Sequence, residues 1–442
     1  MIYNILKDYM EARPNDTFIY YNDRDITYEN ITYSLESRIK SMQAINIETN
    51  SVIGIYTDNS LDLIEILFTC IEIQVIPLVI PSSFKTNEIE NLCNQVNFDY
   101  FITTWKKSST LPKIDIPIFP IEELSPSIGG CAASKKMKYD INQTACLLLT
   151  SGTTGVPKIA QISIKNILAN CNAWNEVINF NKSDTYFNCL PLHHIGGLSI
   201  IFRALLFGFK VVLTDKFDEN LSIKLMDNHN ISIVSLVPTM LSRIIKLNPK
   251  SNNDLRAVII GGSDCSDDLI KSAIKKNFNV YKSYGMTESS SGVSGFWVKD
   301  NMNNISSSGT LHSEMECKIS KNEILLKGPS IINQYYNGPR IEDWYHTNDR
   351  GYIDSNGFLY VLGRKDIIIS GGENIDLQEI ENTINNHPDV KQTFVKSIPD
   401  DEWGDKVIAY ISCDNFNVLK LKDWLKTQLS DYKIPKEFIQ ID

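Results

Sequence analysis

Short apolar segments alternate with segments of helical periodicity through much of this 442-residue chain, and this alternation constrains its fold most strongly. Val52–Thr57 and Val75–Ile80 have the continuous apolar composition of buried strands. Between them, residues 60–73 place apolar side chains such as Leu63 and Leu67 at helical spacing. A helix between two buried strands is typical of parallel sheets that are covered by helices. We therefore expect the beginning of the chain to form an α/β unit.

The same alternation recurs up to about residue 282. We expect further buried strands at Cys146–Leu149, Tyr186–Leu190, Lys210–Thr214, Ile231–Val237, Ala257–Ile260 and Val280–Lys282. We expect further helices at Ile164–Val177 and Leu198–Phe207. The predicted fold class is therefore α/β, with a large N-terminal domain of parallel-rich sheets covered by helices.

The pattern changes after about residue 305. Glu323–Lys327 and Phe358–Leu362 are short strand-like segments with turn residues around them, which indicates a β-rich subdomain over about residues 305–363. The last part of the chain has the elements of a small α+β domain. There we expect a loop at Ser370–Ile375, helices at Leu377–Asn385 and Leu419–Ser430, and strands near Gln392–Ser397 and Lys406–Cys413. The predicted division is an N-terminal domain at 1–363 and a C-terminal domain at 364–442.

Charge and cysteine content limit the classes of function. The net charge is −10 and the pI about 5.3, so the chain lacks the basic character of a general nucleic-acid binder. The apolar stretches Leu61–Ile80 and Leu198–Thr214 contain charged residues, such as Glu65 and Arg203, and we do not expect them to span a membrane. Scattered cysteines without a close CxxC pair indicate reduced thiols and the cytoplasm.

The sharpest local motif is Thr150–Lys158, with the sequence TSGTTGVPK, which follows a predicted buried strand. Its glycines permit tight turns, and its hydroxyl and backbone N–H groups can surround a polyphosphate, with Lys158 as a point charge. It is not a Walker A loop, because no Gly-Lys-Ser/Thr follows the required four-residue gap. The plainer interpretation is a surface turn rich in Ser, Thr and Gly.

Three later segments follow in the chain, and the first two carry side chains suited to a nucleotide. Tyr284 can stack on a base and Glu288 can hold Mg²⁺ through oxygen, although an ordinary exposed glutamate is the plainer interpretation. Asp349 can accept two hydrogen bonds from vicinal ribose hydroxyls, and Arg364 can bind ribose or phosphate. The third segment is the loop at Ser370–Ile375, which opens a predicted helix.

In this order and spacing, the four segments resemble the motifs of the adenylate-forming superfamily, which includes acyl- and aryl-CoA ligases, luciferases and the adenylation domains of peptide synthetases. The resemblance covers essentially the whole chain. It implies the adenylate-forming enzyme fold, with a small mobile C-terminal domain, and a two-step reaction. A carboxylate and Mg·ATP first give an acyl-adenylate and pyrophosphate. A thiol, usually that of coenzyme A, then displaces AMP.

The resemblance also implies roles for particular residues. The phosphate loop would comprise Thr150, Ser151, Gly152, Thr153, Thr154, Gly155 and Lys158. Adenine would be flanked by Gly261, Gly262 and Tyr284, phosphate and metal held by Thr287 and Glu288, and ribose bound by Asp349 and Arg364. Gly371 and Gly372 would complete the cofactor-binding set, and Asp366 would be the hinge between the domains. The expected catalytic residues are Lys158, His194, Thr287 and Glu288.

The segment Leu190–Gly208 carries the information on substrate, because superfamily members commonly have a histidine at the position of His194. Together with Ser235–Arg243, this segment looks most like the 2-succinylbenzoate–CoA ligases of menaquinone biosynthesis. That acid has two carboxylates, so the one that is not activated needs a cationic or hydrogen-bonding anchor. By its position in the resemblance Arg243 is the candidate anchor, and an ordinary helix-surface arginine is the other interpretation.

Two positions depart from the superfamily pattern. Thr347–Asp349 reads Thr-Asn-Asp where Thr-Gly-Asp is usual, and the retained aspartate indicates that the change is tolerated. Relatives continue past the equivalent of Tyr432–Asp442 into a Ser-Gly-Lys segment whose lysine serves adenylation, and Lys433 and Lys436 stand too early to match it. On the sequence given, which would lack that terminal catalytic-lysine segment, we expect slow adenylation and a much less impaired thioester step.

The sequence leaves other functions open. The chain could be a ligase for another aryl or fatty acid, or a stand-alone adenylation unit that loads a carrier protein. A non-catalytic nucleotide-binding remnant is a third alternative, although Glu288 and Asp349 are retained. The expected ligands are a small carboxylic acid, ATP, Mg²⁺ and coenzyme A, with no nucleic acid. A homodimer is a possible assembly.

Overall fold

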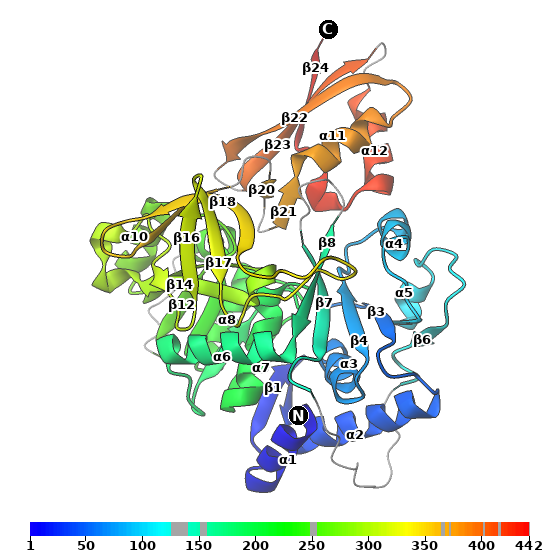
Figure 1. Cartoon of the computed structure of the whole chain (residues 1–442), viewed down its shortest axis with the longest axis vertical. Helices are drawn as coiled ribbons and strands as arrows, with labels where there is room; N and C mark the ends of the chain where they lie inside the picture. The colour runs from blue at the N-terminus through cyan, green and yellow to red at the C-terminus, as the bar shows by residue number, and fades with distance from the viewer. Residues whose placement is uncertain are drawn as a thin grey trace.

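The computed structural model describes residues 1–124, 140–150, 157–247, 254–363, 367–370, 373–400, 403–413 and 417–441. Figure 1 shows two large sheets with their helices in the lower part of the molecule, and a smaller lobe of orange and red elements above them. The described residues form four sheets, and the fold is α/β, as expected. We call the part with β20–β24, α11 and α12 the small lobe.

The first large sheet has the strand order β6-β5-β3-β4-β7-β8. Its strands are β3 (Val52–Tyr56), β4 (Ile76–Ile80), β5 (Tyr100–Thr103), β6 (Ile118–Pro120), β7 (Thr144–Thr150) and β8 (Lys158–Ser163). The accompanying helices are α3 (Leu61–Glu72), α4 (Thr86–Cys93) and α5 (Trp105–Ser108). The strands pair in parallel except for β8, which is antiparallel to β7. The predicted strand–helix–strand unit near the start of the chain is therefore confirmed.

The second large sheet has the order β15-β14-β13-β12-β11-β9-β10-β1-β2. Its strands are β1 (Thr17–Tyr21), β2 (Arg24–Thr27), β9 (Thr185–Asn188), β10 (Lys210–Leu213), β11 (Ile233–Leu236), β12 (Ala257–Ile260), β13 (Val280–Met286), β14 (Ser291–Trp297) and β15 (Thr310–Leu311). Its helices are α1 (Ile2–Ala12), α2 (Tyr28–Ala44), α6 (Ile164–Ile178), α7 (Ile195–Phe207), α8 (Glu219–Asn228), α9 (Pro238–Lys246) and α10 (Asp267–Lys275). The run from β1 through β13 is parallel, and β2, β14 and β15 are antiparallel additions at its two sides.

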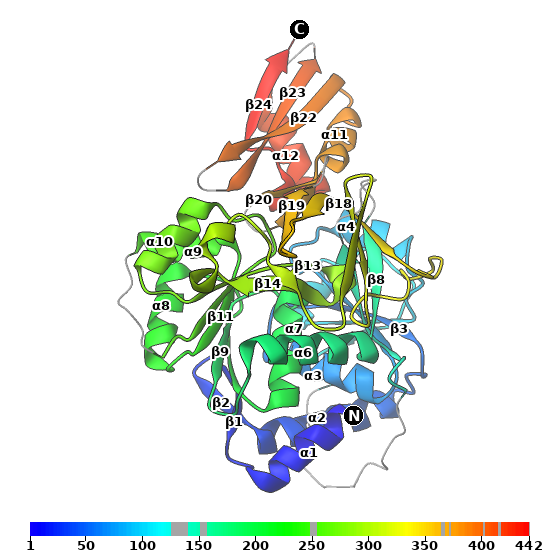
Figure 2. The same cartoon turned by 60° about the vertical axis from the view of Figure 1, so that its left-hand side comes forward.

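The two large sheets share one apolar core. That core takes buried side chains from strands of both sheets, for example Ile53 of β3 and Val211 of β10. Between the sheets α3 and α7 lie side by side (Figure 2). The ring centroids of Phe68 in α3 and Phe202 in α7 are 6.1 Å apart. Burial on several sides explains why α7 is apolar around most of its circumference, as a core helix must be.

The β-rich region predicted before residue 363 is present. The antiparallel sheet β16-β17-β18-β19 has the strands β16 (Glu316–Ser320), β17 (Glu323–Lys327), β18 (Tyr345–Ile353) and β19 (Leu359–Gly363). Three short 3₁₀ helices precede it, η1 (Thr287–Ser289), η2 (Val298–Asp300) and η3 (Met302–Asn304).

The small lobe is a sheet of order β21-β20-β23-β22, to which β24 adds in parallel beside β23. Its elements are β20 (Ile367–Ser370), β21 (Glu373–Asp376), α11 (Leu377–Asn385), β22 (Val390–Asp400), β23 (Gly404–Cys413), α12 (Val418–Gln428), η4 (Asp431–Lys433) and β24 (Glu437–Ile441). The prediction of a loop at Ser370–Ile375 is wrong, because the described residues of this segment belong to the antiparallel strands β20 and β21. Cross-strand pairing that periodicity cannot reveal gives these residues their strand conformation.

Several boundaries differ from those expected, and α7 shows why. It begins at Ile195, not at Leu198, and Gly197 lies in its first turn. A Cβ on Gly197 would lie 2.5 Å from the carbonyl oxygen of Pro191, so only glycine allows this approach of helix and preceding chain. Apolar periodicity cannot register a glycine that is needed for close packing. Among the helices that the structure describes, none combines the length and the apolar character needed to cross a bilayer.

Candidate active site

Sheet topology gathers predicted site residues at one edge. Neighbouring parallel strands run in the same direction, so the segments after β9, β12 and β13 leave the second sheet at the same edge. His194 follows β9, Gly261 and Gly262 follow β12, and Thr287 follows β13. Gly262 has a φ of +81°, a left-handed conformation that glycine adopts without strain. The sheet therefore brings together residues separated by nearly a hundred positions.

The phosphate-loop motif lies at the end of an antiparallel pair of strands. Thr150 ends β7 and pairs with Lys158, the first residue of β8, and its hydroxyl donates a hydrogen bond to the carbonyl oxygen of Lys158 at 3.3 Å. Of the predicted site residues, Ser151, Gly152, Thr153, Thr154, Gly155, Arg364, Asp366, Gly371 and Gly372 lie outside the described residues. The two flanking strands hold Thr150 and Lys158 close together.

Tyr284 and Asp349 form a direct contact in this region. The Tyr284 hydroxyl donates a hydrogen bond to Oδ2 of Asp349 at 2.6 Å, and the Asp349 side chain is buried. The Thr347 hydroxyl donates to the carbonyl oxygen of Ile324 and accepts from the N–H of Asp349 at 3.0 Å. An aspartate held in this way keeps acceptor capacity for hydroxyl groups of a ligand.

Asn348 explains how the chain tolerates its departure from Thr-Gly-Asp. Its φ is +60°, in the left-handed region that glycine enters freely and asparagine enters more readily than most residues. Its N–H donates to Oε1 of Glu323 at 3.0 Å. The expectation that the change is tolerated therefore has a conformational basis.

Glu288 and Lys158 converge on a tyrosine that the sequence had not singled out. Glu288 lies in η1, is buried, and accepts a hydrogen bond at Oε1 from the hydroxyl of Tyr335 at 2.9 Å. The ammonium of Lys158 lies 5.2 Å from the centroid of the Tyr335 ring. The hydroxyls of Tyr335 and Tyr345 are 2.8 Å apart. A carboxylate that accepts one hydrogen bond retains lone pairs for a hard cation such as Mg²⁺.

These contacts belong to one neighbourhood because β18 connects them. Tyr345, Thr347 and Asp349 alternate with exposed residues and so share the buried face of that strand. Tyr345 reaches Glu288 through Tyr335, and Asp349 reaches Tyr284 directly. No sequence pattern identifies Tyr335, since it lies in an irregular segment between β17 and β18.

His194 contacts the small lobe. Its Nε2 lies 2.9 Å from Oε2 of Glu373 in β21. Burial, together with the neighbouring His194, lowers the pKa of His193 to about 3, so His193 is neutral at ordinary pH. Ligand atoms of His193, His194 and Glu373 all lie within 4.8 Å of one another, a set that can hold a metal ion such as Zn²⁺.

The predicted anchor of the second carboxylate, Arg243, pairs with a side chain of a neighbouring helix. It lies in the last turn of α9, its side chain is about half exposed, and it forms an ion pair with Glu219 of α8. Its guanidinium carbon lies 5.3 Å from the centroid of Phe217. Neither partner is among the predicted site residues.

Arg203 is a functional candidate that the sequence reasoning missed. It lies on α7 and is only 2% exposed, and its Nη2 donates to Asn170 at 3.0 Å and to the Ser291 hydroxyl at 3.1 Å. Its carbon Cζ lies 4.5 Å from the centroid of Trp174, and its Nε is buried without a hydrogen-bond partner. Burial lowers the pKa of Arg203 from its usual value. These neutral partners leave a buried positive charge uncompensated, which is costly unless an anion binds.

Arg203 lies close to the predicted phosphate and metal residues. Ser291 pairs in register with Met286, the residue before Thr287. Asn170 also donates to the carbonyl oxygen of Ser289 in η1 at 3.4 Å. The signal in the sequence is an arginine inside an otherwise apolar helix, a pattern that also argues against a membrane span.

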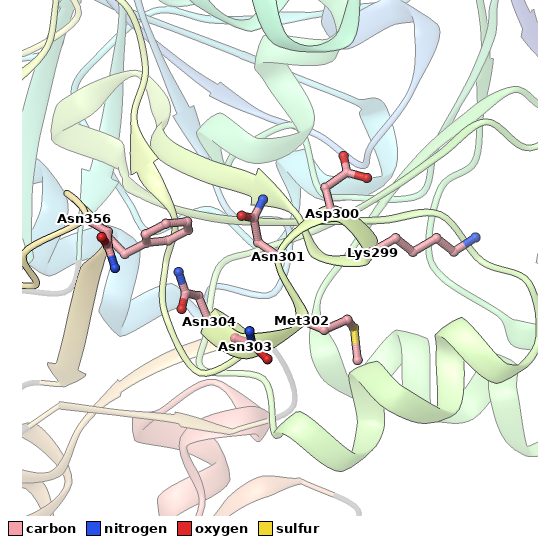
Figure 3. Close-up of a pocket in the computed structure, with 8 residues that line it drawn as sticks. Lys299, Asp300, Asn301, Met302, Asn303, Asn304 and Asn356 are labelled. Atoms are coloured by element: carbon pink, nitrogen blue, oxygen red, sulfur yellow. The ribbon is translucent and has the colours of Figure 1, made fainter.

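One surface hollow lies apart from these residues. It has a volume of about 470 Å³ and is lined by η2, η3 and neighbouring residues (Figure 3). The lining residues are Lys299, Asp300, Asn301, Met302, Asn303, Asn304, Asn356 and Phe358. It includes none of the predicted site residues, so we do not assign the chemistry to it.

The sequence matches known families over most of its length. Residues 6–336 match the AMP-binding enzyme family, and residues 379–442 match the AMP-binding enzyme C-terminal domain. A 2-succinylbenzoate–CoA ligase of Lactococcus lactis is 31% identical over 99% of this chain and 96% of its own length. One from Listeria monocytogenes (EGD-e) is 30% identical over 99% of this chain and 95% of its own length.

Two solved structures of one relative differ in how closely they superpose on this chain. A double mutant of the Bacillus subtilis o-succinylbenzoate CoA synthetase, bound to its product analogue OSB-NCoA, is 26% identical with a TM-score of 0.92, over 99% of this chain and 95% of that one. The same enzyme in complex with the acyl-adenylate OSB-AMP gives 0.76, over 99% and 94%. The resemblance to adenylate-forming enzymes is thus confirmed: the chain belongs to the AMP-binding enzyme family.

Proposed function

We propose that this chain is an ATP-dependent ligase that activates 2-succinylbenzoate as an acyl-adenylate and then transfers the acyl group to coenzyme A, as in menaquinone biosynthesis. The observation that carries the proposal is the convergence of Lys158 and Glu288 on Tyr335, next to the Tyr284–Asp349 pair. These groups suit the phosphates, a metal ion and the ribose of ATP. The relatives from Lactococcus and Listeria are ligases for this acid.

The reaction has two displacements. A carboxylate oxygen of the acid attacks the α-phosphorus of ATP, the bond to the pyrophosphate oxygen breaks, and the acyl-adenylate remains. The sulfur of coenzyme A, after losing its proton to solvent, then attacks the acyl carbon, and AMP leaves with the bonding electrons. Each step concentrates negative charge that positioned cations and hydrogen-bond donors can stabilise.

The chain's own residues divide these tasks. Lys158 supplies positive charge to the phosphates from the start of β8. Asp349 accepts hydrogen bonds from the ribose hydroxyls, and Tyr284, which donates to Asp349, orients the carboxylate. Glu288 would hold Mg²⁺, which when bound neutralises phosphate charge.

We assign the second carboxylate of the substrate to Arg203. A guanidinium that is buried among neutral partners, with one N–H unpaired, is suited to bind a carboxylate. Its partner Ser291 pairs with Met286, just before Thr287, a position compatible with an acid whose other carboxylate meets ATP. Arg243 stays the competing candidate, and substitutions of the two arginines should affect substrate binding differently.

We further propose a domain division, a cellular compartment and an assembly for this chain. We divide the chain into an N-terminal domain at 1–363 and a C-terminal domain at 364–442, with the hinge at Asp366. The buried cysteines, which are free within the described residues, support a reducing compartment such as the cytoplasm. We retain the homodimer as a prediction.

The deciding experiment measures pyrophosphate release and acyl-CoA formation with 2-succinylbenzoate, substituted benzoates and fatty acids as competing acids. We expect the highest kcat/KM with 2-succinylbenzoate and a CoA thioester as product, identified by mass spectrometry. Preference for another acid would support the alternative that the chain is a ligase for another aryl or fatty acid. Pyrophosphate release without a CoA thioester would support carrier-protein loading.

A further inference from the structure

The small lobe contacts the first large sheet through α4. Glu88 of α4 accepts a hydrogen bond at Oε1 from the ammonium of Lys433 at 3.2 Å, and at Oε2 from the hydroxyl of Ser430 at 2.6 Å. The backbone N–H of Lys85 also donates to Oε2 of Glu88 at 3.0 Å. Both oxygens of this carboxylate are therefore engaged, and two of its three donors come from the small lobe.

Lys433 has a second carboxylate partner within its own lobe. Its ammonium donates to Oε1 of Glu379 in α11 at 2.8 Å. Lys433 is 6% exposed and Glu88 8% exposed, so the charges are largely removed from water. Burial works against the charge of Lys433, but Glu379 and Glu88 hold its pKa above the usual value. In such surroundings a charge that loses its partner is strongly unfavourable.

Further contacts near the Lys433–Glu88 pair join residues 85–87 with residues 428–431. The Asn87 amide donates to the carbonyl oxygen of Gln428 at 2.6 Å, and Lys85 forms an ion pair with Asp431 at 3.3 Å. Figure 1 shows α4 directly below α12, where these segments meet. These contacts are polar, which is typical of an interface that can open.

Solved structures of a relative suggest at which step this contact forms. A double mutant of the Bacillus subtilis enzyme, bound to a product analogue, fits this chain with a TM-score of 0.92, and the enzyme bound to the acyl-adenylate fits with 0.76, at nearly equal coverage. The relative therefore has at least two arrangements, and this chain has the one found with the product analogue. A contact made in only one arrangement shifts the equilibrium toward it.

We propose that the Lys433–Glu88 pair is the latch that docks the small lobe for the thioester-forming step, with Lys433 and Glu88 as positioning residues. The inference rests on the proposed function. It also gives a role to Lys433, which stands too early in the sequence to be the adenylation lysine. Glu379 keeps Lys433 charged and ordered in its own lobe, and Glu88 provides the attraction across the interface.

The division of partners makes the latch testable without unfolding the lobe. In Glu88→Gln the lobe still has its own Lys433–Glu379 pair, and only the attraction across the interface is weakened. Glu88→Lys places a second cation against Lys433 and should open the interface. The double variant E88K/K433E again has one ammonium and two carboxylates at the contact, so it should dock. Glu90→Lys makes the same charge change on the exposed side of α4 and serves as the matched control.

Each half-reaction is measured separately with the full chain: pyrophosphate release with ATP and acid, and thioester formation with supplied acyl-adenylate and coenzyme A. We expect Glu88→Lys to slow the thioester step at least about tenfold and adenylate formation by less than about twofold, with Glu88→Gln intermediate. E88K/K433E should restore most of the loss, and Glu90→Lys should behave as wild type. An unchanged thioester step in Glu88→Lys, or equal losses in both steps, would overturn the latch.

A second measurement separates the latch from the proposed function. Small-angle X-ray scattering of the wild type and Glu88→Lys reports the lobe arrangement without any reaction, and we expect a larger radius of gyration in the variant. A wild type that is inactive on every acid, together with this shift, would reject the proposed function and keep the docking contact. Identical scattering curves would reject the docking contact.

Discussion

Nε2 of His194 and Oε2 of Glu373 lie 2.9 Å apart, although 179 positions separate the two residues in the sequence. His194 precedes α7 in the large part of the molecule, and Glu373 lies in β21 of the small lobe. Burial works against both charges, yet the Glu373 carboxylate raises the pKa of His194 and His194 lowers the pKa of Glu373. The pair is therefore a pH-dependent contact between the two parts.

We predict that Glu373→Gln lowers stability mainly in an intermediate pH range. The contribution of His194 is complete below its unfolded pKa of 6.5 and is lost as pH rises through its higher folded value. The contribution of Glu373 is present above its unfolded pKa of 4.5 and is lost as pH falls through its lower folded value. Between these limits the difference in unfolding free energy should be about 0.5–1 kcal/mol, because both side chains are partly exposed. Urea unfolding of both proteins across pH checks this, and a difference independent of pH would contradict the pairing.

Glu288→Gln should raise the Mg²⁺ requirement of pyrophosphate release. Glutamine keeps the shape and can still accept the hydrogen bond from Tyr335, but it loses the charge that a hard cation prefers. A loss of about 1.5–3 kcal/mol in metal binding corresponds to roughly tenfold or more in the half-saturating Mg²⁺ concentration. Tyr335→Phe removes the hydroxyl that contacts Glu288 and Tyr345 but leaves the Glu288 charge in place, so it should have a smaller effect. Identical Mg²⁺ titrations for Glu288→Gln and wild type would make Glu288 a structural residue.

The two candidate arginines should differ in their effects on substrate choice. Arg203→Met removes the buried charge with little loss of volume and should cost about 2–4 kcal/mol of binding, seen as a raised KM for 2-succinylbenzoate. Its effect on a benzoate without the second carboxylate should be small. Arg243→Ala should leave both acids nearly unaffected, since that side chain already pairs with Glu219. The opposite pattern in KM values would return the anchor to Arg243.

Asn348 provides a prediction on stability alone. Because its φ is +60°, Asn348→Val should destabilise the protein by about 1–2 kcal/mol, and Asn348→Gly should be nearly neutral. The backbone hydrogen bond to Glu323 remains in both variants, so the conformational effect is isolated. Asn356→Val, at an exposed turn position whose φ is not positive, is the control. Equal unfolding free energies for the valine and glycine variants would contradict this explanation.

Local features of the fold could be read from the sequence. The bounds of β12, β17 and α11 agree with those expected, because apolar periodicity and length are properties of the segment itself. The position of β1 beside β10 could not be read in this way, since it joins segments nearly two hundred residues apart. Strand order depends on which apolar faces find each other in the folded core.

The candidate site also has features that the sequence predicts and features that only the structure reveals. The residue types in the motifs, such as Lys158, Glu288 and Asp349, point to nucleotide chemistry because charge and hydrogen-bonding capacity belong to each side chain. Tyr335 and Arg203 acquire their importance from burial and neighbours, which only the packed structure supplies. An isolated sequence shows Arg203 and Arg243 as equal cations, whereas the tertiary structure buries one among neutral groups and pairs the other with a glutamate near the surface. The sequence thus determined which chemistry was available, and the tertiary structure decided which charges are left for a ligand, because desolvation is set by the fold as a whole.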